Sequence, residues 1–138
     1  KRGSNPEDYV KGNENILYPK WEKGHYKGGI GEYDRLEQAR KINREAADAS
    51  ASWGMFQIMG FNYAACGEES IESFVRSMCE SEFKQLLLTA NFIKKNSQML
   101  QALQARDWAV FAKCYNGPAY AQNRYDVKLE AAYQKYSL

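Results

Sequence analysis

The chain has 138 residues, of which 44% are hydrophobic and 14% aromatic, and this composition is typical of one folded domain. A chain of this length can bury a core without disulfide bonds or a metal. Its 19 basic and 17 acidic residues leave a formal net charge of +2, which argues against a nucleic-acid partner. No run approaches the roughly 18 apolar residues of a membrane helix, so we expect no membrane insertion.

The cysteines and the single histidine do not form a metal-binding pattern. Cys66, Cys79 and Cys114 cannot all pair within one chain, and none belongs to a Cys-x-x-Cys motif. We expect them to be thiols on the buried faces of helices. His25 lies in a glycine-rich stretch without a second ligand nearby, so we predict no metal site and no cofactor.

The first part of the chain, residues 1–31, is polar and interrupted by glycine and proline, which favours irregular structure. We therefore predict a single domain made of an irregular arm over 1–31 and a helical body over 32–138. The apolar residues that can hold the arm against the body are Ile16, Leu17, Tyr18 and Trp21.

Helical periodicity begins at about Gly31 and continues to Asp48. Apolar residues recur there every three or four positions and form one face, which consists of Leu36, Ala39, Ile42, Ala46 and Ala49. We expect one helix whose apolar face packs under the segment that follows.

That segment, residues 50–67, is apolar and almost uncharged, yet it contains the polar side chain of Gln57. An amide that is buried without a partner costs free energy, so Gln57 needs either a local backbone partner or a ligand. Gly54 and Gly60 bracket the segment and permit a turn or a close approach by another backbone. A packed core turn and a ligand-binding turn both fit these residues.

The segment beyond Gly67 has a helical pattern with recognisable helix starts. Ser70 can cap a helix over residues 71–79, because its hydroxyl can accept a free backbone N–H group of the first turn. A longer helix begins at Ser81 and carries an apolar stripe of Phe83, Leu86, Leu87, Ala90 and Ile93. This stripe predicts the central buried helix of the domain.

The C-terminal part of the chain continues in the same way. A short amphipathic segment ends near Arg106, and Asp107 is a good N-cap for a helix over residues 108–114. A final helix has one face made of Tyr125, Leu129, Ala132 and Tyr136. We predict a mainly α domain of six or seven helices with at most a minor β-hairpin.

Two motifs resemble those of a known family. The first lies in residues 49–67 and includes Gly54-Met55-Phe56-Gln57-Ile58-Met59. The second consists of Asp107-Trp108, Phe111-Ala112 and Tyr115-Asn116-Gly117-Pro118, followed by Asn123 and Tyr125-Asp126. In this order they resemble the N-acetylmuramidase domain of phage endolysins and bacterial cell-wall enzymes, within the lysozyme-like superfamily.

The resemblance implies a lysozyme-like helical fold and a glycoside hydrolase whose partner is the glycan strand of peptidoglycan. The enzyme would cleave the β-1,4 bond between N-acetylmuramic acid and N-acetylglucosamine, with a glutamate as general acid. Such antimicrobial enzymes act on the bacterial cell wall, either after export or after release from the cytoplasm at phage lysis.

The resemblance also implies a set of substrate-binding residues, which are Ser52, Trp53, Gln57, Tyr115, Asn116 and Tyr125. Tyrosine, asparagine and glutamine supply stacking faces and neutral hydrogen-bond donors and acceptors, which suit N-acetyl groups. We expect Gln57, Tyr115 and Asn116 to converge on one cleft, bordered by Ser52 and Trp53.

The catalytic acid of the family has no match in the sequence. In the family, a glutamate on a Val-Glu-Ser-like helix precedes a Tyr-Pro segment, and no such helix precedes Tyr18-Pro19. We therefore expect the acid upstream of Lys1, with the chain as the C-terminal part of a longer polypeptide. Glu45 is the alternative within the chain, although a place on a solvated helix face is its simpler interpretation.

If the catalytic helix lies elsewhere, the cleft should have an open apolar wall. We expect an N-terminal segment of the same protein or a dimer mate to cover it. Three functions fit these observations: part of an active muramidase, a non-catalytic peptidoglycan-binding relative, and a helical scaffold whose aromatic residues all belong to the core.

Overall fold

The computed structural model describes residues 5–18, 20, 22 and 24–137. In these residues the chain forms seven α-helices, three short 3-10 helices and one two-stranded hairpin, which confirms the predicted mainly α class. The α-helices are α1 (Gly31–Ile42), α2 (Arg44–Ser50), α3 (Ile71–Glu80), α4 (Glu82–Lys95), α5 (Ser97–Ala105), α6 (Trp108–Asn116) and α7 (Tyr125–Tyr136). The remaining elements are η1 (Pro6–Tyr9), β1 (Ser52–Trp53), β2 (Ile58–Met59), η2 (Gly60–Asn62) and η3 (Tyr120–Asn123).

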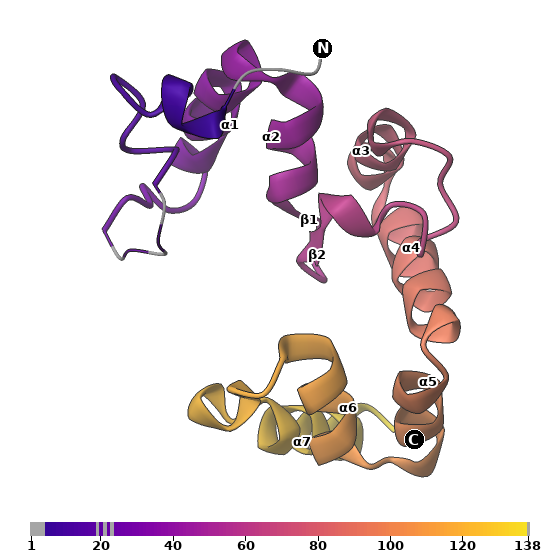
Figure 1. Cartoon of the computed structure of the whole chain (residues 1–138). Helices are drawn as coiled ribbons and strands as arrows, with labels where there is room; N and C mark the ends of the chain where they lie inside the picture. The colour runs from indigo at the N-terminus through magenta and orange to yellow at the C-terminus, as the bar shows by residue number, and fades with distance from the viewer. Residues whose placement is uncertain (1–4, 19, 21, 23, 138) are drawn as a thin grey trace.

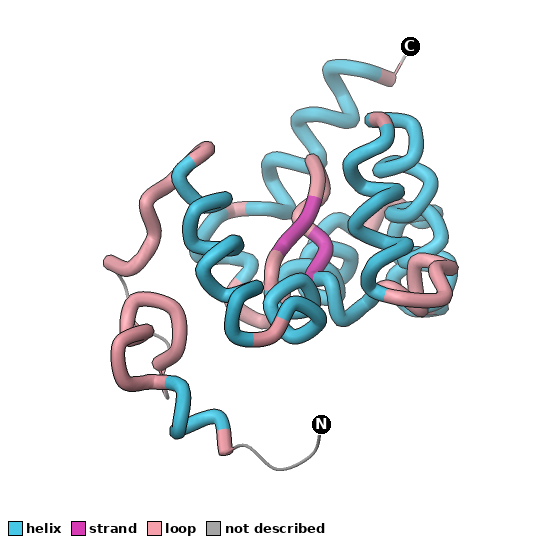
Figure 2. The backbone as a smooth tube through the Cα atoms, turned by 90° about the horizontal axis from the view of Figure 1, so that it is seen from above, coloured by secondary structure: helices cyan, strands magenta, loops and turns pink. Residues whose placement is uncertain are grey.

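The hairpin lies between two groups of helices. The arm, α1 and α2 lie on one side of it, and α3 to α5 lead from its other side towards α6 and α7 (Figure 1). Seen from above, the hairpin is in the middle of the helices and the arm extends away from them (Figure 2). The strands pair antiparallel, with Ser52 opposite Met59 and Trp53 opposite Ile58.

Side-chain caps define where each helix from α2 to α6 begins. In each case the residue before the helix accepts a hydrogen bond from a backbone N–H group of the first turn; these residues are Asn43, Ser70, Ser81, Asn96 and Asp107. The predicted caps Ser70 and Asp107 are thus confirmed. Ser70 also forms a capping box with Ser73.

The single helix expected up to Asp48 is instead two helices. Asn43 has an extended backbone (φ −157°), and its Oδ1 accepts the N–H of Ala46 at 2.9 Å. The asparagine side chain therefore competes with the helical backbone, ends α1 and starts α2.

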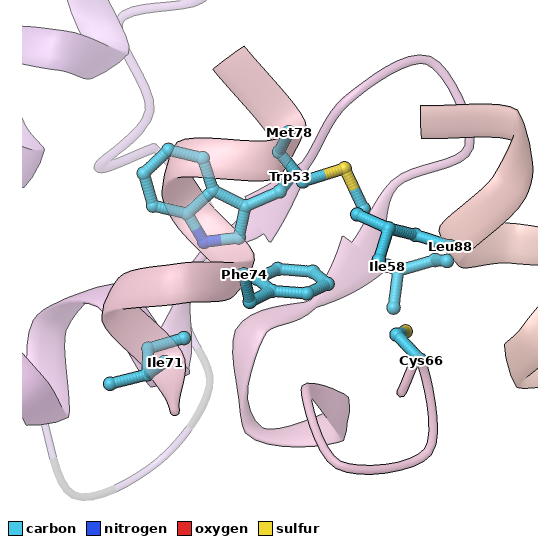
Figure 3. Packing of buried hydrophobic residues seen from close by; sticks show 7 residues of the cluster. All are labelled: Trp53, Ile58, Cys66, Ile71, Phe74, Met78 and Leu88. Atoms are coloured by element: carbon cyan, nitrogen blue, oxygen red, sulfur yellow. The ribbon is translucent and has the colours of Figure 1, made fainter. Parts of the chain in front are cut away.

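Two apolar clusters form the core. The larger cluster joins the hairpin to α3 and α4, and it has the ring of Phe74 in its middle (Figure 3). Its buried members are Trp53, Ile58, Cys66, Ile71, Phe74, Met78 and Leu88. The second cluster lies between α5 and α6 and contains Met99, Ala102 and Phe111. Phe92 and Tyr115 pack against both clusters, so they connect the two halves of the core.

The predicted buried stripe of α4 is wrong for its first three residues, whereas Ala90 and Ile93 are half-buried. Phe83, Leu86 and Leu87 are exposed, whereas the buried residues of α4 are Leu88 and Thr89. The side chain of Gln85, one turn before Leu88, makes hydrogen bonds to the hairpin turn and to α3, so this face of the helix points inward.

The expectation for the thiols is only partly met. Cys66 is fully buried but lies in a turn, Cys79 is exposed on α3, and Cys114 is half-buried on α6. In the arm, Ile16, Leu17 and Tyr18 are half-buried, and Trp21 lies outside the described residues. None of the helices in the described ranges is long and apolar enough to cross a membrane.

Candidate active site

The turn between β1 and β2 presents Gln57. The backbone N–H of Gln57 donates to the Gly54 carbonyl at 3.3 Å, and its side-chain Nε2 donates to the same oxygen at 2.9 Å. Gln57 has a left-handed backbone (φ 54°), which disfavours residues other than glycine. The residue is exposed, so its amide is both locally anchored and open to a ligand.

Tyr115 holds this turn from a distant helix. Its hydroxyl donates to the carbonyl of Phe56 at 2.7 Å across 59 positions of sequence. The ring of Tyr115 stacks on Phe111 with centroids 5.7 Å apart and meets the edge of Phe92 at 5.9 Å. The two sequence motifs therefore meet at the turn, with Tyr115 behind it.

Burial raises the pKa of the Tyr115 phenol to about 12. Because the folded-state pKa lies above the unfolded value of about 10, this group contributes stability that is complete below about pH 10 and is lost as pH rises towards 12. An absorbance titration of tyrosinate should show one phenol that ionises late, and Tyr115→Phe should remove it. A variant that keeps the late component would show that another tyrosine carries it.

The base of the hairpin rests on a buried ion pair. Nε of Arg40 on α1 donates to Asp48 Oδ1 on α2 at 2.6 Å, and this hydrogen bond raises the pKa of the Arg40 guanidinium above its ordinary value. The Trp53 indole N–H donates to the Asp48 backbone carbonyl at 2.9 Å. The Arg40 guanidinium also lies 5.8 Å from the centre of the Trp53 ring. Trp53 is thus fixed relative to α1 and α2.

A cavity of about 970 Å³ lies between the arm, α1, α2 and the hairpin. Its hairpin end is lined by Ser52, Trp53 and Gln57. The wall formed by α1 and α2 has an apolar stretch, which contains Leu36, Ala39, Ile42, Ala46 and Ala47, beside the polar side chains of Glu32, Arg35, Asn43 and Ser50. The cavity therefore has a polar rim at the hairpin and, along the two helices, an apolar stretch flanked by polar and charged side chains.

Glu32 is the one acidic residue among the described residues that line this cavity. Its carboxylate accepts the backbone N–H groups of Lys27 at 2.6 Å and Gly28 at 2.9 Å, and it pairs with Arg35 at 2.6 Å. The Gly28 hydrogen bond is the main cause that lowers the pKa of Glu32. Glu32 is therefore held ionised and is not suited to donate a proton.

The structure does not bring Glu45 to the cavity. Glu45 is exposed on α2 and lines a separate pocket of about 530 Å³ together with Arg44, Asp48 and Glu69. Ala46, Ala47 and Ser50 of the same helix line the large cavity instead. The alternative acid and the Gln57 rim thus belong to different pockets.

The remaining predicted binding residues lie outside the cavity lining. Asn116 is exposed at the end of α6, and Tyr125 is 36% exposed at the start of α7 with the Lys128 ammonium 5.6 Å from its ring centre. Their contact with substrate stays a prediction, as does that of Tyr115. No group of three or more His, Cys, Asp or Glu in the described ranges gathers where it could hold a metal ion.

Sequence reasoning missed two groups of the site. The charged residues Arg40 and Asp48 are typical of a solvent-exposed helix face, yet Asp48 is only 4% exposed. Gln85 reads as a polar interruption of an apolar helix, yet its side chain bonds to the hairpin turn. The two opposite charges eight positions apart were a weak sequence signal of the ion pair. Nothing in the sequence indicated the role of Gln85.

The helical body, the small hairpin and the cavity beside the Gln57 turn together define a lysozyme-like domain. The sequence matches the family described as N-acetylmuramidase over residues 1–137, and the chain belongs to this family. The sequence-based identification of the family and fold is therefore confirmed.

A solved structure supports the same assignment. The chain is similar to the Burkholderia AP3 phage endolysin, with 41% sequence identity and a TM-score of 0.85 over 95% of the chain. It spans 50% of the length of that endolysin chain. The comparison with curated proteins returns no match.

Proposed function

We propose that this chain is the peptidoglycan-cleaving domain of an N-acetylmuramidase that hydrolyses the β-1,4 bond between N-acetylmuramic acid and N-acetylglucosamine. The observation that carries the proposal is the exposed Gln57 amide at the rim of a large cavity, on a turn fixed by Tyr115. Ser52 adds a hydroxyl to the same rim. These neutral donors and acceptors suit the acetamido and hydroxyl groups of amino sugars.

Hydrolysis of this bond needs a carboxylic acid that an apolar environment keeps protonated. Glu32 is ionised, and Glu45 lies in another pocket. We propose that the acid is a glutamate on a segment outside these 138 residues, seated in the apolar part of the cavity between α1 and α2. A helix with small and aliphatic side chains on one face fits this wall.

The catalytic steps are then shared between the seated segment, which supplies the acid, and the 138-residue chain, which binds the sugar. The glutamate of the seated segment gives its proton to the glycosidic oxygen, and the bond from the anomeric carbon to that oxygen breaks. Water then adds its hydroxyl to the anomeric carbon and returns its remaining proton to the glutamate carboxylate. Gln57 and Ser52 orient the sugar beside that acid by hydrogen bonds. We expect desolvation by the apolar stretch of the wall to raise the pKa of this acid and so to favour its protonated form.

The test extends the chain at Lys1 with the residues encoded upstream and measures turnover of purified peptidoglycan. We expect turnover by the extended protein, no turnover by residues 1–138 alone, and new reducing ends that are N-acetylmuramic acid. A Glu→Gln change in the added segment should abolish activity, whereas Glu45→Gln should retain it. Turnover by the 138-residue chain that Glu45→Gln removes with the fold intact would overturn the proposed acid.

The ionised state of Glu32 and the position of Glu45 in another pocket also fit a second function. Because no described residue of the cavity supplies a protonated acid, the chain fits a peptidoglycan-binding domain without turnover. Saccharide binding without turnover by the extended protein would establish this alternative.

If instead a second copy of the chain supplied the acid, the activity of the 138-residue chain would rise with the square of its concentration.

Gln57→Gly separates binding from folding. Glycine removes the strain of the left-handed backbone but adds chain entropy to the unfolded state, so we expect a stability change within about 1 kcal/mol. Loss of the amide should weaken binding of an N-acetylated oligosaccharide about tenfold. Gln57→Asn is the matched control, since asparagine tolerates this conformation and keeps an amide. Unchanged affinity in the glycine variant would remove Gln57 from the site.

A further inference from the structure

We propose that Gln85 is a positioning residue, which fixes the peptide unit that holds Gln57 in place. Gln85 lies in the first turn of α4 and is half-buried. Its Oε1 accepts the backbone N–H of Met55 at 2.9 Å, and its Nε2 donates to the backbone carbonyl of Met78 at 2.8 Å. The consequence for glycan binding rests on the proposed function, whereas the positioning of the turn does not.

The two hydrogen bonds connect the hairpin turn to the end of a helix. α3 ends at Glu80, so the carbonyl of Met78 is among the last four of the helix and lacks a partner within it. Gln85 caps this carbonyl and uses the other end of the same amide to hold the turn. One side chain therefore sets the distance between α3 and the turn.

The Met55 N–H and the Gly54 carbonyl belong to one planar peptide unit. Gln85 holds the N–H edge of this unit, and the carbonyl edge accepts both the backbone N–H and the side-chain Nε2 of Gln57. Rotation of the unit would withdraw the shared acceptor, the Gly54 carbonyl oxygen, from both donors of Gln57 at once. The orientation of the Gln57 amide therefore depends on Gln85 through a single rigid group.

The packing leaves little freedom for another arrangement. A Cβ atom on Gly54 would lie 2.9 Å from both Gln85 Oε1 and Met78 Sδ, so the amide packs directly on the glycine. A side chain at position 85 must also offer an acceptor to Met55 and a donor to Met78. Among side chains of this length, only an amide or a protonated carboxyl group offers both.

The positioning role is tested by hydrogen exchange in the full chain. We compare Gln85→Met, which keeps the length but loses both hydrogen bonds, with wild type. The amides of Met55 and Gln57 should exchange about tenfold faster, while those of α6 and α7 keep their wild-type rates. Gln101→Met is the matched control, because Gln101 is exposed on α5 and makes no side-chain hydrogen bond among the described residues; it should change no rate.

Gln85→Glu tests the hydrogen bonds separately from packing, because it should make the exchange rates of the turn amides depend on pH. At neutral pH the carboxylate has no proton to donate to Met78, so the turn amides should exchange as fast as in Gln85→Met. Below the pKa of the new carboxyl group, rates corrected for the intrinsic pH effect should return towards wild type. Wild type at the same pH controls for the titration of Glu80 and Glu82 nearby.

Binding of an N-acetylglucosamine oligosaccharide completes the experiment. We expect Gln85→Met to bind about tenfold more weakly than wild type and Gln85→Glu to recover affinity at low pH. Uniformly faster exchange along the chain, unchanged rates at Met55 and Gln57, or no recovery in Gln85→Glu would overturn the positioning role. If wild type bound no saccharide, the exchange data would still decide the role of Gln85, and only the proposed function would fail.

Discussion

Gly60→Ala is expected to destabilise the domain by about 3 kcal/mol or more. A Cβ atom on Gly60 would overlap the backbone carbonyl oxygen of Asp48, and it would lie 2.8 Å from Ile71 Cδ1 and 2.9 Å from Ala49 Cα. Two of these contacts are backbone atoms, which cannot move without separating α2 from η2, where Gly60 lies. Urea unfolding of both proteins measures the difference.

Gly29→Ala is the control for the loss of a glycine as such. Gly29 has a positive φ of 53°, but no atom lies within 4 Å of the Cβ position, so only backbone strain of about 1–2 kcal/mol applies. If Gly60→Ala were no more destabilising than Gly29→Ala, the close approach of α2 to η2 would be wrong.

Arg40→Met is expected to cost about 3–5 kcal/mol, because it leaves the buried carboxylate of Asp48 without its close partner. Asp48 is 4% exposed, and its other cation, Arg44, lies 3.9 Å away on an exposed side chain. The loss should also release Trp53, whose indole N–H bonds to the Asp48 backbone. Unfolding followed by tryptophan fluorescence measures both effects.

The cause of that loss can be separated by a second substitution. Adding Asp48→Asn to Arg40→Met removes the unpaired charge, so the double variant should be more stable than Arg40→Met alone. Glu37→Gln is the control, since Glu37 pairs with the same arginine but its side chain is 60% exposed; it should cost no more than about 1 kcal/mol. A double variant no more stable than Arg40→Met would show that packing, not charge, explains the loss.

The parts of the fold that depend on neighbours in sequence were predictable. Ser70 and Asp107 cap their helices because each side chain reaches a backbone N–H three residues away. The burial of α4 was not predictable, because the inward face is chosen by Gln85 and its partners up to 30 residues away. Periodicity ranks Phe83 above Gln85 as a core residue, and the tertiary hydrogen bonds reverse that order.

In the candidate site, too, some residues could be predicted from the sequence and others could not. Residue type and resemblance pointed to Gln57 and Tyr115, and the structure joins them through the Phe56 carbonyl. Gln85 bonds to backbone atoms that any residue would offer, so the sequence carries no pattern for it, and the side-chain pair of Arg40 and Asp48 is marked only by a weak signal, two opposite charges eight positions apart. The positions of Asn116 and Tyr125 outside the cavity lining depend on how α6 and α7 pack, which the motif did not specify.

The central claim is that the hairpin end of the large cavity is the glycan-binding site. The most direct measurement is an NMR titration of the isotopically labelled chain with an oligosaccharide of alternating N-acetylglucosamine and N-acetylmuramic acid. We predict that the largest shift changes fall on Ser52, the Trp53 indole and the Gln57 side-chain amide. Changes confined to Glu45 and its pocket, or no change at saturating saccharide, would contradict the claim.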